Sequence, residues 1–246
     1  MLAVVYSLLA AVVVGVGAAF VPFIGPIGAI LPGLVAGVAT YFLFVRRVNA
    51  LLKNELGQLQ GLLANKNVEG ALALLEALKL KYSKWIFLLA SQLDGQIGSI
   101  LYVGKRDYDR ARPYLEKAFI RMWDAKLMLA CLQAGVVGKA KGDIKQADAL
   151  LERVAKYTPK QGLLWSTWAW LHWKAGDAKK AIEILARGKE NLGESDAHLT
   201  ANLLALQNDK KMKMKGYGEV WYTLQLEQHP MVMQQQRGGN VRFARR

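Results

Sequence analysis

The first 45 residues of the chain contain no side chain that is charged at neutral pH, because Asp, Glu, Lys, Arg and His are all absent before Arg46. This apolar run is about twice as long as the ~20 residues that one membrane-spanning helix needs. Lipid offers the backbone no hydrogen-bond partners, so a chain within it must form helices. Prolines and glycines near the middle of the run therefore predict a transmembrane helical hairpin over residues 1–45, with helices at Leu2 to Phe20 and Ile27 to Val45.

Small side chains recur every four residues along both predicted helices. Such a seam lets two helices approach until their backbones touch. The alternative is that Gly and Ala are simply frequent in membrane segments. The seams consist of Ser7, Ala11, Gly15 and Ala19 on the first helix and of Gly25, Ala29, Gly33 and Gly37 on the second side. The residues that we expect to pack the hairpin are Gly15, Ala19, Gly33 and Gly37.

Basic residues follow the second predicted helix, at Arg46, Arg47 and Lys53, and the turn between the helices carries no charge. The positive-inside rule therefore predicts an integral protein of the cell or inner membrane, with both termini and the repeat domain in the cytoplasm. A cleaved signal peptide, the main alternative for the first helix, would need a basic stretch before its apolar core. The single cysteine, Cys131, agrees with a reducing compartment, and its apolar neighbours favour an inert thiol over a reactive one.

Further along the chain, two stretches 34 residues apart share one pattern, which begins at Gly142-Asp143 and again at Gly176-Asp177. Lys, Ala, Leu and Arg recur at the same spacing after each pair. The Gly is expected to end one helix in the left-handed conformation, and the Asp to cap the next helix by accepting a bond from a backbone N–H. A fixed period of this size indicates stacked helix pairs.

This unit resembles the tetratricopeptide repeat family, whose helix-turn-helix units carry a skeleton of Trp, Leu, Gly, Tyr, Ala, Phe, Ala and Pro. The matching residues are Trp165 and Ala181 in one unit, Gly135 (as the mid-helix Gly), Ala147 and Pro159 in the preceding unit, and Tyr102, Ala111 and Ala118 in an earlier one. The chain departs from the family at Cys131, in place of Trp, and at Gly188, in place of Ala. The resemblance covers about residues 92–193 and implies an all-α fold in which an α-solenoid of helix pairs follows the hairpin.

Helical periodicity and capping residues divide the rest of the chain. We expect a connecting helix and a degenerate first repeat over residues 46–82, a repeat domain over 83–230 and a flexible basic tail over 231–246. The connecting helix, whose apolar stripe begins at Val48, leads directly out of the membrane, and Asn67 caps the next helix. Further helices are predicted at Ser83 to Val103, Asp107 to Arg121, Ala125 to Lys141, Ile144 to Tyr157, Leu163 to Ala175, Ala178 to Leu192, Asp196 to Gln207 and Tyr217 to Gln228. No alternating pattern typical of strands is found in the sequence.

The residue types that carry catalysis are scattered. His172, His198 and His229 show no metal-ligand spacing, and no Gly-x-Ser-x-Gly turn occurs. Because His172 falls where the family has a core aromatic, we expect a packed histidine there. Carboxylates such as Glu152 lie beside Lys or Arg, which favours exposed ion pairs. The sequence therefore predicts neither an enzyme nor a bound cofactor or metal.

The candidate binding surface lies on the first helix of each pair, because the first helices of such a stack line a concave groove. By the family pattern Trp165 and Trp168 belong to the core, whereas Trp170 and Trp173 turn toward the groove. Exposed Trp side chains often anchor protein interfaces, but all four could also pack within the repeats. The predicted groove residues are Trp170, Trp173, Lys174, Lys139, Val136, Leu132, Gln96 and Ile100. Apolar anchors beside lysines suit a peptide that carries acidic residues.

The net charge of +14 belongs entirely to residues 46–246. Two basic clusters stand out, one of Lys210, Lys211, Lys213 and Lys215 and the other of the arginines in the tail. Each cluster is interpreted either as a contact to an anionic bilayer or as a solvated face. No nucleic-acid-reading motif accompanies the charge, so nucleic acid is not an expected partner.

These observations favour a membrane-anchored scaffold whose cytoplasmic groove binds a protein partner, because anchoring raises the local concentration for a partner in the same membrane. A hypothesis of another class makes the hairpin the working part, which oligomerises in the membrane while the repeats act as spacers. The sequence does not name the partner.

Overall fold

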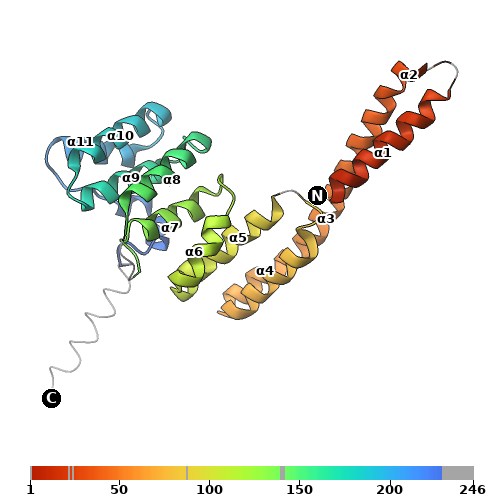
Figure 1. Cartoon of the computed structure of the whole chain (residues 1–246). Coiled ribbons are helices and arrows are strands. Elements are labelled where there is room, and N and C mark those ends of the chain that lie inside the picture. Colours follow the sequence, from red (N-terminus) through yellow and green to blue (C-terminus); the bar gives the residue numbers. More distant parts are fainter. Residues whose placement is uncertain (1, 22, 24, 87, 139–141, 229–246) are drawn as a thin grey trace. The chain divides into compact units, whose positions relative to one another are not determined.

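A computed structural model describes residues 2–21, 23, 25–86, 88–138 and 142–228 of the chain (Figure 1). The described residues form helices, turns and loops without any strand, so the all-α prediction is confirmed for them. The chain divides between Ile97 and Gly98 into two compact parts, which we call the N-terminal unit and the C-terminal unit. The predicted basic tail and Lys139 lie outside the described residues.

The N-terminal unit begins with a helical hairpin. Helix α1 spans Leu2–Ala19, a single turn α2 spans Gly25–Gly28, and α3 runs without interruption over Ile30–Ala64 (Figure 1). Both α1 and α3 are long and apolar enough to cross a membrane. The predicted helix end at Val45 is wrong, because the stripe that begins at Val48 continues the same helix and buries Val48 and Leu52.

Two more helices follow in this unit, where Asn67 caps α4 (Val68–Tyr82) as predicted by accepting a hydrogen bond of 2.9 Å from the backbone N–H of Gly70. The predicted cap at Ser83 is wrong, because Ser83 ends α4 and α5 begins only at Leu89. Helix α5 (Leu89–Ile100) closes in a wide turn, η1 (Leu101–Lys105), and contains the boundary between the two units.

The C-terminal unit contains the repeated helices. The bounds of these helices are α6 Tyr108–Lys117, α7 Trp123–Gln133, α8 Ile144–Tyr157, α9 Gly162–Lys174, α10 Ala178–Leu192 and α11 Ala197–Gln207. The predicted bounds of α8 and α10 agree with the structure to the residue. Asp143 and Asp177 cap these two helices, each accepting a backbone N–H at 2.9 Å, so the predicted caps are confirmed.

Small residues allow the helices of this unit to approach closely. Ala147 and Ala181 are fully buried on α8 and α10. A Cβ atom added to Gly188 would lie 2.8 Å from the Cβ atom of Trp165. A larger residue at position 188 would therefore have to displace α9.

The two glycines of the repeated pattern play different roles. Gly176 follows α9 with a φ of +90°, as predicted for a helix-ending glycine. Helix α7 instead ends before Gly135, which has a φ of +69°, and residues 136–142 precede Asp143. The roles predicted for Gly142, as a helix end, and for Gly135, as a mid-helix residue, are therefore wrong. A Cβ on Gly142 would lie 2.2 Å from the carbonyl carbon of Ala134, so close packing requires this glycine.

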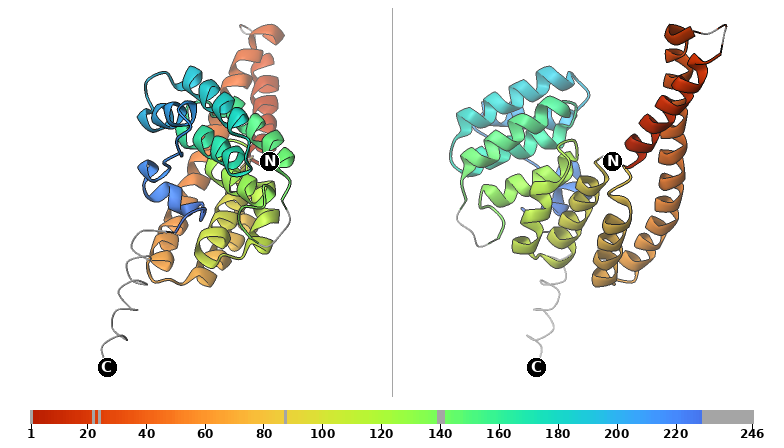
Figure 2. Two further views of the ribbon diagram at one scale, coloured as in Figure 1. Left: turned by 90° about the vertical axis from the view of Figure 1, so that its left-hand side faces the viewer. Right: turned by 45° about the vertical axis from the view of Figure 1, so that its right-hand side comes forward.

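The end of the described chain departs most from the prediction. The helix expected at Tyr217 to Gln228 is wrong, because only η2 (Lys215–Tyr217) and the short α12 (Glu219–Thr223) form there. Residues 210–227, which we call the C-terminal segment, fold back beside the helices of their own unit (blue in Figure 2). Glycines such as Gly218, with a φ of +63°, interrupt any longer helix.

Candidate functional site

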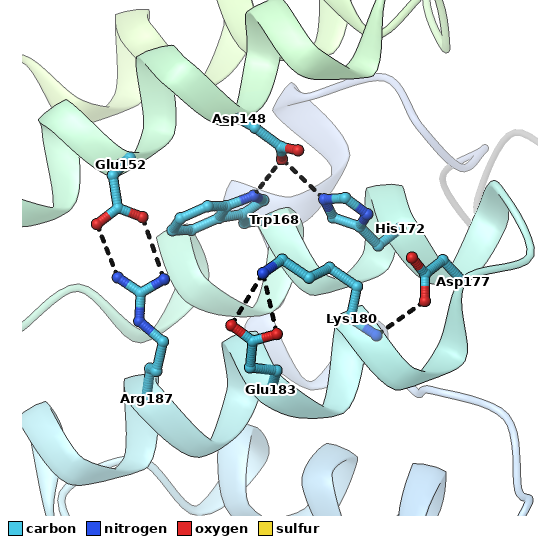
Figure 3. A network of polar contacts seen from close by, with 8 residues as sticks. All are labelled: Asp148, Glu152, Trp168, His172, Asp177, Lys180, Glu183 and Arg187. Carbon is cyan, nitrogen blue, oxygen red and sulfur yellow. Dashed lines mark hydrogen bonds and ion pairs between the residues drawn. The ribbon is translucent and has the colours of Figure 1, made fainter.

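Helix α9 has two faces that make different contacts. The first face packs against α8 and α10. Trp165 and Trp168 stack with ring centroids 5.8 Å apart. The guanidinium of Arg187 lies 5.6 and 5.5 Å from the centroids of these two rings. The same guanidinium donates two hydrogen bonds, of 3.1 and 2.8 Å, to Glu152 (Figure 3). This face therefore ties α9 to α8 and α10.

Asp148 adds a second polar contact on this face. Its carboxylate accepts a hydrogen bond of 2.7 Å from Trp168 Nε1, and the same oxygen lies 2.7 Å from Nε2 of the buried His172 (Figure 3). No group of three His, Cys, Asp or Glu side chains in the described residues could hold a metal ion. The hydrogen bond from Arg187 holds the pKa of Glu152 below its usual value. The arrangement is that of a structural contact between helices.

The opposite face of α9 is covered by the C-terminal segment. The indole of Trp170 meets that of Trp221 edge to face, with ring centroids 5.3 Å apart. Trp170 is only 4% exposed and Trp221 is fully buried. The expectation of an exposed anchor at Trp170 is therefore wrong, because the chain itself supplies the covering group. Trp173 stays half-buried, with Lys174 Nζ 5.1 Å from its ring centroid.

The segment makes polar contacts with three elements of its own unit. On α11 the side-chain oxygen of Asn202 accepts a hydrogen bond of 2.7 Å from the backbone N–H of Lys213. On α9 the hydroxyl of Ser166 lies 2.7 Å from that of Tyr217, which donates to Asp196 at 3.2 Å. Along its own sequence, the segment therefore contacts first α11 and then α9.

The third element is η1, together with the start of α6. The Tyr102 hydroxyl donates a buried hydrogen bond of 2.7 Å to the carbonyl oxygen of Leu224. The Gln225 amide donates to the carbonyl oxygens of Tyr102 and Val103, at 2.9 and 3.2 Å. The Tyr108 hydroxyl donates to the Gln225 side-chain oxygen at 2.6 Å. This part of the unit therefore contacts both the backbone and the side chains of the C-terminal segment.

Burial sets the ionisation of the groups around the segment. It raises the pKa of the Tyr102 and Tyr217 hydroxyls above the usual range, so both keep their protons and act as donors at neutral pH. Burial also raises the pKa of the Cys131 thiol to about 12. A thiol in this state is a poor nucleophile, as the sequence predicted for Cys131.

The other predicted groove residues differ in burial. Leu132 is buried in α7, whereas Val136 is exposed just beyond that helix. Gln96 and Ile100 are both half-buried on α5.

The segment contains the residues that sequence reasoning missed. The prediction that the sequence has no alternating pattern is wrong for this stretch, because Met212 and Met214 alternate with Lys211, Lys213 and Lys215. In the structure the two methionines are buried and the three lysines are exposed. Such a period of two is typical of an extended chain with one covered side.

The small residues of the hairpin lie where α1 and α3 meet. A Cβ atom on Gly33 would lie 2.7 Å from the carbonyl oxygen of Ala11 and 3.1 Å from the Cα atom of Gly15. On Gly37 it would lie 2.9 Å from the Cβ atom of Ala11. Ala19 and Gly15 line a shallow pocket nearer the connecting turn. The close approach of the two backbones depends on these residues.

No protein-family model, curated protein or solved structure matches this chain. The resemblance to the tetratricopeptide repeat family therefore depends on the residues named above.

Proposed function

We propose that this chain is a membrane-anchored scaffold whose C-terminal unit binds an extended segment of a protein partner. The observation that carries the proposal is the binding of residues 210–227 by their own unit. The helices of the C-terminal unit already contact a polypeptide through its backbone and through its aromatic side chains. A partner segment with a similar pattern of aromatic anchors takes the place of the C-terminal segment. The role is non-catalytic, and the binding unit faces the cytoplasm.

The hairpin supplies the anchor in this proposal. Helices α1 and α3 have the length and hydropathy of membrane spans, and most of their large apolar side chains, such as Val13 and Phe42, are exposed. Confinement to a membrane raises the concentration of the binding unit around a membrane-bound partner. Basic residues after the spans, such as Arg46 and Arg47, favour the cytoplasmic side.

The second candidate, in which the hairpin oligomerises through its small residues, has less support. Gly33 and Gly37 already approach the backbone of α1 within the same chain. A subunit contact through the same glycines would need the hairpin to open. Cross-linking in membranes separates the two ideas, because the scaffold works with a monomeric hairpin and the second candidate does not.

The scaffold is tested with a labelled peptide of residues 210–227 and the full chain in detergent. The Trp221→Ala chain, whose own segment is loosened, is expected to bind the peptide, whereas the wild-type chain is not. A peptide that itself carries Trp221→Ala serves as the control and should not bind. Failure of the variant chain to bind the wild-type peptide would contradict a separable binding surface.

The partner is then sought by affinity capture from detergent extracts with the same two chains. We expect Trp221→Ala to recover more of the partner than the wild-type chain. Adding Trp170→Leu to the variant should remove that gain, because it changes the ring that contacts the aromatic anchor and leaves the other residues on that face of α9 unchanged. Equal recovery with all three chains would contradict the proposal.

A further inference from the structure

An apolar pocket of about 400 Å³ lies in the N-terminal unit, between α3 and the chain that follows α4. Its volume falls in the range of small-molecule sites. Carbon-rich side chains make most of the lining. These residues are Phe44, Val48, Leu51, Tyr82 and Trp85.

The pocket sits where the apolar run gives way to charge. Phe44 is two residues before Arg46, the first charged side chain of the sequence. The rings of Tyr6, Phe44 and Trp85 stack on one another, with centroids 5.7 to 6.1 Å apart. Aromatic belts of this kind lie at the headgroup level of a bilayer.

The start of α1 is bonded to the residues beside the pocket. The backbone N–H of Leu2 donates to the carbonyl oxygen of Lys84 at 2.6 Å, and that of Ala3 donates to the carbonyl oxygen of Trp85 at 3.4 Å. These bonds hold the chain after α4 against the hairpin. The pocket is therefore formed by one end of the hairpin together with the end of α4 and the residues that follow it.

The charge around the pocket is positive. Arg47 and Lys81 line it together with a single carboxylate, Glu55. That carboxylate is already engaged, because one of its oxygens accepts hydrogen bonds of 2.8 Å from both Lys81 and the Tyr82 hydroxyl. Glu55 therefore balances the charge of Lys81 but not the charge of the Arg47 guanidinium. Arg46 and Lys84, which are neighbours of the lining residues in the sequence, are exposed.

We infer that this pocket holds one phospholipid with a net negative headgroup. An acyl chain fills the apolar lining, and the phosphate accepts hydrogen bonds from Arg47, whose planar guanidinium suits phosphate oxygens. The combination of an apolar interior and a cationic rim matches both parts of such a lipid. This inference rests on the membrane insertion of the hairpin that is proposed above.

The test uses the full chain in detergent, titrated with phosphatidylglycerol or with phosphatidylcholine of the same acyl chains, and native mass spectrometry counts the bound lipid. The wild-type chain is expected to retain one phosphatidylglycerol in preference to phosphatidylcholine. Arg47→Gln should weaken that binding about tenfold, the effect of losing a hydrogen bond to a charged group. Arg46→Gln is the matched control and should change it far less.

A second variant tests the pocket itself. Leu51→Trp fills apolar volume without changing charge, so we expect it to reduce retention of phosphatidylglycerol as well. Equal retention of the two lipids would overturn the inference, because no preference for a negative headgroup would remain. Equal losses from Arg46→Gln and Arg47→Gln would overturn it in favour of diffuse surface charge. Flotation with neutral vesicles keeps the two proposals apart: a chain that fails to float removes the anchor and the lipid site together, whereas a chain that floats without lipid preference removes only the lipid site.

Discussion

The hairpin and the C-terminal unit bury opposite kinds of side chain. Between α1 and α3 the backbones approach at glycines and alanines, while large residues such as Val13 and Phe42 are 68% and 67% exposed. In the C-terminal unit the fully buried residues include Trp221 and Leu164, and charged side chains such as Lys211 and Lys213 are exposed. The difference teaches which solvent each exterior suits, because an apolar exterior is stable in lipid and unstable in water.

Removing a large side chain should therefore matter in one region and not in the other. Trp221→Ala is expected to lower the free energy of unfolding by about 3 to 5 kcal/mol, because it empties a closed site against Trp170. Phe42→Ala should leave the hairpin contact intact. Denaturant unfolding of the full chain in detergent, followed by circular dichroism, measures both. Val220→Ala is the control beside Trp221, and equal effects of these two variants would show that the segment is not part of the fold.

Adding a charge should have the reverse pattern. Val13→Lys on α1 is expected to cost about 2.5 to 3.5 kcal/mol of membrane insertion. Leu204→Lys on α11 changes a residue that is 54% exposed in the other unit, and it should have no effect on insertion. The fraction of chain that resists carbonate extraction from membranes measures the difference. Full insertion of the Val13→Lys chain would contradict the lipid-facing assignment of α1.

A smaller change sharpens the view of the C-terminal segment. Tyr217→Phe removes the hydroxyl that contacts Ser166 and Asp196, and we expect a loss of about 1 kcal/mol in the free energy of unfolding. Tyr157→Phe changes an exposed residue and serves as the matched control. Unfolding curves of the two variants should differ, and coincident curves would contradict an anchoring role for Tyr217.

The smallest expected effect concerns the ion pair between α8 and α10. Glu152→Gln should cost less than about 1 kcal/mol at neutral pH, because both partners are partly exposed. Arg187 lowers the folded pKa of Glu152, so the stabilisation is complete above the usual value of 4.5 and is lost as the pH falls through the lowered pKa. The difference in stability between wild type and Glu152→Gln should accordingly shrink in acid. Glu183→Gln is the control, and a difference that persists unchanged in acid would contradict the assignment.

Local signals in the sequence predicted the helices that have strong caps and regular periodicity. Asp143 and Asp177 marked the starts of α8 and α10 because a cap depends only on residues within one turn. Prediction failed where spacing alone was used, as at Gly142, because α7 ends at Gln133 and the positive φ after it falls at Gly135. The face of α9 that carries Trp170 was chosen from the family pattern, but its burial depends on Trp221, which is distant in sequence.

The sequence by itself determined that the N-terminal residues form apolar helices and that helix pairs follow, since an uncharged run and helical periodicity are properties of neighbouring residues. Only the tertiary structure decided that residues 210–227 cover α9 and that Arg47 borders a pocket beside Trp85. Contacts between distant parts of the chain depend on how whole helices pack, and no local pattern encodes the partner that a given face will meet.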